Sequence, residues 1–476
     1  MKSTRNAAVV YINSKRHELR GEEAFMMLAD YLRYSAGLTG TKIVCAEGDC
    51  GACSVLKASY FGGRPATFEP VNACIVMMAQ LDGCHIVTVE GLKTDEGLSP
   101  VQDAMVRCHA SQCGYCTPGF AIAITNCVAR GKQSEQGIKN ALTGNLCRCT
   151  GYSPLIEAAM MVDAEALPSI ESRYLSAVKH EDLQGITAQA LHLSSESHTF
   201  FAPTTIKDAV KLRKAHSGSR LLASGTDIGV MINKGKSTDA VFISLHLIEG
   251  LYAIRREGTR FHVGARVTLS EVHDACQDLI PEFAKLLNIF ASPQIKNIGT
   301  LIGNVANGSP IGDTLPFLMV ANATVHTVNS RGERTIPIES LYVGYRQLAL
   351  QSDEIISSIS FDVPKLNETL KLYKASQRKD LDIATVSCAF SVRQARGTIT
   401  EARLAVGGVG ATVIRLTEVE AFLLGKILSE DLIEASSQLL QQSIKPLSDV
   451  RGTNSYRRVL VDGLFRKYFS ELGGQV

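Results

Sequence analysis

The chain has 476 residues, which is enough for roughly three domains. Its 49 Lys and Arg residues are balanced by 47 Asp and Glu residues, and the net charge of +2 favours neither nucleic acid nor an acidic surface as a partner. The first residues lack the apolar core of a signal peptide, and no run of about 18 uncharged apolar residues occurs. We therefore expect a cytoplasmic protein with no membrane span.

The cysteines are concentrated in the front third of the chain. Eleven of the 13 lie between residues 45 and 149. In a reducing compartment, closely spaced cysteines bind metal more often than they form disulfides. The front third is therefore expected to be the metal-binding part.

The first cysteine set lies in and after the glycine-rich stretch 41–54. It consists of Cys45, Cys50, Cys53 and Cys74. A C-x4-C-x2-C spacing with a distant fourth cysteine is typical of a plant-type [2Fe–2S] cluster. Gly48 and Gly51 permit the backbone conformations with which such a loop wraps a cluster. The alternative is a zinc site, because the Cys50–Cys53 spacing alone would suit zinc equally well.

The residues around this loop predict a small ferredoxin-like domain over 1–90. Short β-rich runs occur at 9–13 and 17–19, apolar residues at helical spacing occur at 24–33, and a last strand is expected at 85–90. Strands, a helix and a metal loop in this order favour a β-grasp fold.

A second cysteine set falls in a segment, 91–165, that is expected to be all-helical. It consists of Cys113, Cys116, Cys147 and Cys149. Each pair precedes a helix-start signal, Thr117-Pro118 and Ser153-Pro154, so helices are predicted over 120–128 and through Met161. Helix N-termini beside thiolates would stabilise an anionic metal centre. Zinc is again the alternative on spacing alone.

The residue pattern of the remaining chain changes twice. Residues 166–196 are polar with little periodicity and are interpreted as an extended linker. From 197 to 366 the pattern is α/β, with a helix at 205–216 and a strand that leads into the small-residue turn 223–227, which is a candidate anion-binding nest. From 367 to 476, strands at 385–392 and 402–407 are followed by helices.

A second glycine-rich stretch, 294–313, suits a backbone that approaches a ligand closely. No G-x-G-x-x-G follows a strand, so a Rossmann dinucleotide site is not supported.

Three motifs, at 38–53, 112–119 and 144–152, resemble those of the xanthine dehydrogenase (molybdenum hydroxylase) family. The resemblance implies a multidomain α+β chain with a β-grasp ferredoxin domain, an all-helical [2Fe–2S] domain, an α/β FAD-binding domain and an α+β C-terminal flavoprotein domain. It also implies two [2Fe–2S] clusters on the eight cysteines, with Gln112 near a pterin held by another polypeptide. Val44 departs from the glycine that the family usually has there.

The same resemblance implies FAD contacts in the later domains. These would be Ala223, Ser224, Gly225, Thr226, Asp227, Ile228, Phe290, Ala291, Thr300, Gly303, Asn304, Asp313 and Asp382. Ser224 and Ile302 stand where the family usually has glycine, and an isoleucine would crowd the flavin unless it points away. For Asp382 the alternative is a turn-capping role. Arg378 and Lys379 would receive a pyridine nucleotide or simply be solvated.

The family's large molybdopterin domain has no counterpart here, so the resemblance implies the small subunit of a split xanthine dehydrogenase. Its partner would be a large molybdopterin subunit, in a heterotetramer of two small and two large chains. During oxidation of hypoxanthine and xanthine to urate, electrons would pass through the helical-domain cluster, the ferredoxin-type cluster and FAD to NAD. No catalytic acid or base is expected in this chain. The alternatives are another molybdenum hydroxylase, for an aldehyde or N-heterocycle, and a non-enzymatic zinc-binding scaffold.

Overall fold

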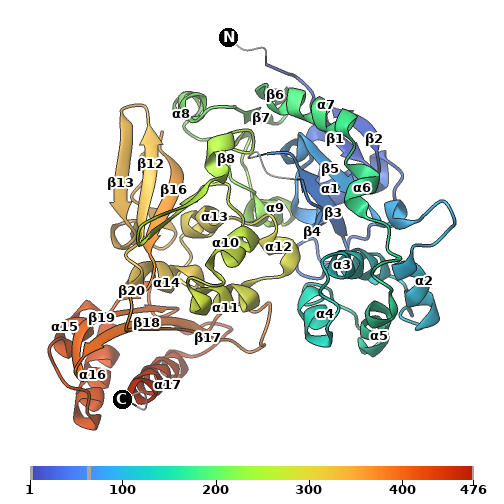
Figure 1. Ribbon diagram of the computed structural model, residues 1–476. Coiled ribbons are helices and arrows are strands. Elements are labelled where there is room, and N and C mark those ends of the chain that lie inside the picture. The colour runs from blue at the N-terminus through green and yellow to red at the C-terminus, as the bar shows by residue number, and fades with distance from the viewer. Residues whose placement is uncertain (1–3, 62–65, 474–476) are drawn as a thin grey trace. The chain divides into compact units, whose positions relative to one another are not determined.

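The computed structural model describes residues 4–61 and 66–473 (Figure 1). The chain divides into two compact units: unit 1 comprises residues 1–252 and 292–299, and unit 2 comprises 253–291 and 300–476. The segment 292–299 therefore leaves the second unit in sequence and packs within the first. Among the described residues, no helix is long and apolar enough to cross a membrane.

Unit 1 begins with a five-stranded sheet in the order β2-β1-β5-β3-β4. The strands are β1 (Ala8–Ile12), β2 (Lys15–Leu19), β3 (Ser54–Ser59), β4 (Glu69–Asn72) and β5 (Cys84–Val87). The central strands β1 and β5 are parallel, and the other pairs are antiparallel. This is the expected β-grasp arrangement. The helix predicted over 24–33 is broken into a short 3-10 turn, α1 (Leu28–Asp30) and a π-helical turn that ends at Ser35.

The next segment is helical, as predicted (Figure 1). Its helices are α2 (Pro100–Arg107), α3 (Thr117–Ala129), α4 (Glu135–Ala141) and α5 (Ser153–Met161). Nine of the 13 residues of α3 are buried, including every residue from Gly119 to Thr125, and a helix that is apolar on all sides belongs in a core. This core is continuous with Leu56 and Val87 of the β-grasp sheet, so the two cysteine-bearing parts share one interior.

The segment expected to be an extended linker, 166–196, is instead folded. It contains α6 (Ile170–Tyr174), α7 (Ala177–Thr187) and β6 (Leu191–Ser194). Tyr174 donates a hydrogen bond to Gly91 O at 2.6 Å, and Tyr11 donates one to Asp182 at 2.9 Å. Ile170, Leu183 and Ile186 are also buried, so the segment packs within unit 1 through both polar and apolar contacts.

The α/β part of unit 1 contains a four-stranded sheet in the order β6-β7-β9-β8. Its further elements are β7 (Thr199–Ala202), α8 (Ile206–Ala215), β8 (Arg220–Leu222), α9 (Thr226–Asn233) and β9 (Val241–Ser244), with the short helix α12 (Pro293–Lys296) from the inserted segment. Strands β7, β9 and β8 are parallel, so α8 and α9 are crossover helices. The α/β pattern predicted for 197–366 is therefore confirmed for the strands and helices up to β9.

Unit 2 begins with an antiparallel sheet in the order β10-β11-β16-β12-β13. The strands are β10 (Ile254–Glu257), β11 (Arg260–Gly264), β12 (Thr324–Asn329), β13 (Gly332–Pro337) and β16 (Ile355–Asp362), and a small hairpin is formed by β14 (Tyr342–Gly344) and β15 (Gln347–Leu348). The helices are α10 (Leu269–Cys276), α11 (Pro281–Phe290), α13 (Leu301–Asn307) and α14 (Thr314–Val320).

The C-terminal part of unit 2 is a second antiparallel sheet in the order β17-β18-β19-β20, with three helices (Figure 1). The elements are β17 (Glu368–Ala375), β18 (Val386–Ala395), β19 (Thr398–Gly407), β20 (Ile414–Arg415), α15 (Thr417–Leu423), α16 (Glu430–Ser443) and α17 (Asn454–Gly473). Phe390, Phe465 and Tyr468 lie in its core. The predicted multidomain α+β class is confirmed.

Candidate metal and cofactor sites

The first cysteine group lies between the π-helical turn and β3, with Cys74 in the turn after β4. The fold brings all four sulfurs together: Cys45 shares side-chain hydrogen bonds with Cys50 and Cys74, and Cys74 shares one with Cys53. Glu47 N–H also donates to Cys45 Sγ at 3.4 Å. These contacts link the four sulfurs in the order 50, 45, 74 and 53.

Contacts among these sulfurs shift the pKa values of their thiols in opposite directions. Hydrogen bonds from Cys50 and then Cys74 lower the pKa of Cys45 far below that of an ordinary thiol. The contact with Cys45 in turn raises the pKa of Cys50 and of Cys74. Cys45 is therefore the most acidic of these three thiols, and a positively charged metal centre would stabilise several thiolates together.

The backbone of this loop adopts the left-handed conformation three times, at Ala46 (φ 54°), Gly48 (φ 75°) and Gly51 (φ 69°). Such turns make the chain curl around one point and aim its amides inward. Val44, the departure noted in the sequence, is 58% exposed. Its side chain therefore lies outside the ring of sulfurs and does not fill it.

The second cysteine group is arranged as two pairs. Cys113 and Cys149 have their Sγ atoms 3.6 Å apart, and Cys116 hydrogen bonds with Cys147. Cys116 is the N-cap residue of α3, whereas the other pair member, Cys147, precedes α5 in a loop.

Neighbouring polar groups orient this second loop. Tyr152, with φ 72°, accepts the N–H of Cys147 at 3.0 Å, and Gln112 donates to Cys149 O at 3.1 Å. Burial raises the pKa of Cys147, but hydrogen bonds from the hydroxyl and amide of Thr150 and the amide of Cys149 outweigh it, so the pKa is lowered overall. Burial raises the pKa of Cys116 to about 12. The loop thus stabilises one thiolate before any metal binds.

Four gathered sulfurs in each group suit a [2Fe–2S] cluster, in which each iron takes two thiolates. In the described ranges, no three or more His, Cys, Asp or Glu side chains are grouped so closely that they could hold a metal ion. All 13 cysteines lie within those ranges, and none is in a disulfide. The eight predicted ligands therefore form two groups of free thiols.

The predicted flavin loop of unit 1, 223–228, follows β8 and starts α9. Gly225 is the N-cap residue of α9 with φ 75°, so the amides of the first turn face outward from a tight turn. Free N–H groups at a helix start are suited to phosphate oxygens. Gln80 donates to Ser224 O at 2.9 Å, which ties this loop to the segment that follows Cys74.

In unit 2, the structure brings Phe290 and Asp313 to one buried lysine. Lys374 Nζ lies 2.8 Å from Asp313 Oδ2 and 3.5 Å from Phe290 O. Asp313 Oδ1 is buried and has no hydrogen-bond partner in the described part of the chain. An unsatisfied acceptor at this place fits a ligand with a donor group, such as a flavin. Lys374 was missed by the sequence analysis, because β17 shows no clear alternation there.

The other flavin candidates of unit 2 take local roles. Thr300 caps α13 by accepting Gly303 N–H at 2.9 Å, and Asn304 accepts the hydroxyl of Thr314. Ala291 follows the last residue of α11. Ile302, the second departure, is only 4% exposed, so its side chain packs into the interior of the unit.

Asp382 caps its own turn. It accepts the N–H groups of Arg378 at 2.9 Å and Ile383 at 3.1 Å. The turn-capping alternative thus describes the local structure, and a role towards flavin remains a proposal.

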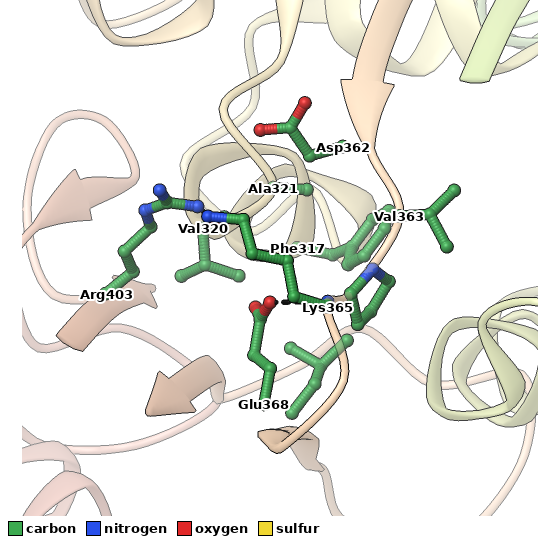
Figure 2. Close-up of a pocket in the computed structure, with 10 residues that line it drawn as sticks. Phe317, Val320, Ala321, Asp362, Val363, Lys365, Glu368 and Arg403 are labelled. Carbon is green, nitrogen blue, oxygen red and sulfur yellow. Dashed lines mark hydrogen bonds between the residues drawn. The ribbon is translucent and has the colours of Figure 1, made fainter. Parts of the chain in front are cut away.

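A small pocket in unit 2 lies elsewhere (Figure 2). Phe317, Lys365, Glu368 and Arg403 are among its lining residues, and none of the predicted flavin contacts is. The pocket has room for about one water molecule, which is too little for a cofactor.

Comparison with known proteins agrees with this arrangement. Residues 88–160 match a [2Fe-2S] binding domain, 194–365 match the FAD binding domain in molybdopterin dehydrogenase, and 371–472 match the CO dehydrogenase flavoprotein C-terminal domain.

Relatives named xanthine dehydrogenase align along almost the whole chain. Xanthine dehydrogenase 1 of Arabidopsis thaliana is 29% identical over 97% of this chain and 39% of its own length. Xanthine dehydrogenase of Drosophila subobscura is 28% identical over 98% of this chain and 39% of its own. The chain thus spans about two-fifths of the length of these relatives.

Solved structures match 56–57% of the chain. Carbon monoxide dehydrogenase from Hydrogenophaga pseudoflava has a TM-score of 0.54 at 25% identity, and the match covers 56% of this chain and 94% of that one. Quinoline 2-oxidoreductase from Pseudomonas putida 86 has a TM-score of 0.53 at 21% identity, covering 57% and 94%, which shows a shared fold.

Fold, thiol groups and domain matches together define an iron–sulfur and flavin module for electron transfer. In its three matched domains the chain is similar to the iron–sulfur and FAD-binding part of molybdenum hydroxylases.

Proposed function

We propose that this chain carries electrons from a separate molybdopterin-binding subunit through two [2Fe–2S] clusters to FAD and then to NAD. Cys113, Cys116, Cys147 and Cys149 would hold the cluster nearer molybdenum, and Cys45, Cys50, Cys53 and Cys74 the cluster nearer flavin. When bound, these groups supply the one- and two-electron redox chemistry. The protein's own part is to hold them at fixed separations and to tune them by hydrogen bonds.

Helix α9 carries this proposal most directly. Its first turn is part of the flavin loop, and its last residue, Asn233, donates to Ala46 O at 2.8 Å and to Cys74 O at 2.7 Å. A methyl group on Gly229 would lie 2.1 Å from Ile75 O, so helix and ligand segment touch along their length. One short helix thus joins the first thiol group to the flavin loop within unit 1.

We propose that the complete enzyme oxidises hypoxanthine and xanthine to urate, as a heterotetramer of two small and two large subunits. Relatives that align along 97–98% of this chain are named xanthine dehydrogenases, which supports a purine substrate. We propose further that flavin contacts are made by 223–228, Phe290, Ala291, Thr300, Gly303, Asn304, Asp313 and Asp382.

The second candidate is the equivalent part of another molybdenum hydroxylase, for an aldehyde or an N-heterocycle. The solved structures of similar fold, a carbon monoxide dehydrogenase and a quinoline oxidoreductase, favour it. A zinc-binding scaffold is a weaker candidate, because residues 88–160 match a [2Fe-2S] binding domain.

The test is quantification of iron, zinc and flavin in the purified chain, followed by EPR of the reduced protein. About four irons per chain, two [2Fe–2S] signals and released FAD are expected. Zinc without iron would reject the proposal. The complex purified with its partner is then assayed with xanthine, an aldehyde and quinoline, each with NAD or oxygen as acceptor. Turnover of xanthine with NAD is expected, and turnover of another substrate alone would favour the second candidate.

A further inference from the structure

A single buried amide, that of Gln294, contacts the ligand segments of both thiol groups. Gln294 lies on α12 in the inserted segment of unit 1 and has no exposed surface. Its Nε2 lies 3.2 Å from Ser54 Oγ and 2.8 Å from Asn145 Oδ1. Ser54 is the neighbour of Cys53, and Asn145 precedes Cys147 by two residues.

The direction of these hydrogen bonds follows from a shared acceptor. The Ser54 hydroxyl donates to Gly51 O at 2.7 Å, and Asn145 Nδ2 donates to the same oxygen at 3.2 Å. Both side chains therefore present acceptors to Gln294, which must donate to each. Gln294, Ser54, Gly51 and Asn145 form one closed ring of hydrogen bonds.

Beside this ring, the main chains of the two cysteine-bearing segments are in contact. Leu146 N–H donates to Cys50 O at 2.9 Å. A methyl group on Gly51 would lie 2.2 Å from Gly144 O, and one on Gly119 would lie 2.2 Å from Gly51 O. Glycine at these positions is what lets the two main chains approach so closely.

The Cys50–Leu146 hydrogen bond consequently joins a ligand of the first group to the residue beside a ligand of the second. Electrons cross a protein more readily along covalent and hydrogen bonds than across open space. Burial of the Gln294 amide costs folding free energy, because its Oε1 is buried without a hydrogen-bond partner in the described part of the chain. An apolar side chain would avoid that cost, so the two donated hydrogen bonds are what the amide contributes.

We infer that Gln294 is a positioning residue for electron transfer between the two iron–sulfur sites, because it holds the Cys50–Leu146 contact closed. This inference rests on the proposed function, which assigns a cluster to each thiol group. The inserted segment 292–299, from the flavin-binding part of the sequence, would then set the electronic coupling between the clusters.

The test is Gln294→Leu in the full-length, cluster-loaded protein. Leucine has a similar volume and removes both donated hydrogen bonds. The expected result is unchanged iron and flavin content, a weaker magnetic interaction between the two reduced clusters in EPR, and a several-fold slower electron transfer between them after rapid reduction of the flavin. Hydrogen exchange of the metal-free protein should become faster at Leu146.

Asn297→Leu is the matched control, because Asn297 lies in the same segment but donates to Pro70 O on β4. It should leave the interaction between the clusters unchanged. If Gln294→Leu lowers the iron content, Gln294→Asn, whose amide is one methylene shorter, replaces it in the same measurements.

Wild-type coupling and transfer rates in an iron-replete Gln294 variant would overturn the inference. Loss of clusters in both variants would also overturn it, in favour of a purely structural role. A wild-type protein without two [2Fe–2S] signals would instead reject the proposed function, so the two failures are distinguishable.

Discussion

Lys374 on β17 and Asp313 at the start of α14 form a buried ion pair in unit 2, with 2.8 Å between Nζ and Oδ2. Their side chains are only 1% and 5% exposed. Taking both charges out of water is costly, and only good geometry and further hydrogen bonds offset it. Nζ also lies 3.4 Å from Ile289 O, whereas Asp313 Oδ1 has no partner among the described residues. The pair is therefore sensitive to loss of either member.

Removal of the lysine should destabilise unit 2. In flavin-free protein, Lys374→Met leaves Asp313 buried and unpaired, and we expect the free energy of unfolding to fall by about 3–5 kcal/mol. The double variant Lys374→Met/Asp313→Leu should recover most of that loss, because no buried charge remains. Denaturant unfolding measures both. Lys467→Met, at an exposed ion pair with Glu471, is the control and should change little.

The same site should make stability depend on pH. Burial raises the pKa of Asp313 from 3.8 to about 6, although Lys374 opposes the shift. Between these values the folded chain keeps a proton that the unfolded chain has lost, so unfolding releases it and stability falls as the pH rises through this window. Above pH 6 the loss is complete.

Asp313→Asn should remove this component of the pH dependence. Unfolding free energies of the flavin-free variant and the parent protein, compared from pH 4 to pH 7, measure the difference. The exposed carboxylate variant Glu418→Gln serves as control. Parallel curves for Asp313→Asn and the parent protein would contradict the assignment.

Cys113→Ser tests the second thiol group. Because Cys113 pairs with Cys149 in the structure, its loss should remove one [2Fe–2S] signal and lower iron from about four to about two per chain. Reduction of the flavin by NADH should persist, while electrons from the molybdenum partner no longer reach it. Cys108→Ser, outside both groups, should behave like the parent protein; an equal loss of iron there would point to general misfolding.

Gly229→Ala tests the contact between α9 and the first thiol group. The added methyl group would lie 2.1 Å from Ile75 O, a backbone atom that cannot move aside easily. Overpacking of this kind costs about 1–3 kcal/mol. We expect lower flavin content and an altered EPR signal of the ferredoxin-type cluster.

Gly463→Ala is the matched control for that substitution. Gly463 lies within α17, and a methyl group there would meet nothing within 4 Å. Alanine should stabilise the helix by about 0.5–1 kcal/mol and leave both cofactors unchanged. Thermal unfolding and cofactor content distinguish the two variants, and identical behaviour would contradict the proposed contact.

The sequence was most informative where the chemistry is local. Cys45, Cys50 and Cys53 lie within nine residues, so their spacing alone indicates a metal loop. The helix starts at Thr117 and Ser153 were predictable because capping and proline signals act within one turn. The helix predicted over 24–33 is broken in the structure by a 3-10 turn and a π-helical turn. The sequence did not reveal this break, because the apolar spacing continues across both turns.

The sequence by itself determined the eight thiols, the order of the domains and the class of fold, since these follow from spacing, local propensity and hydrophobic pattern. Only the tertiary structure decided that Lys374 joins Asp313 and that Gln294 reaches both Ser54 and Asn145. Ser54 and Gln294 are 240 residues apart, and a buried amide finds its partners only when the backbone has folded. Contacts of that kind depend on side-chain geometry across elements, for which a linear sequence has no local signal.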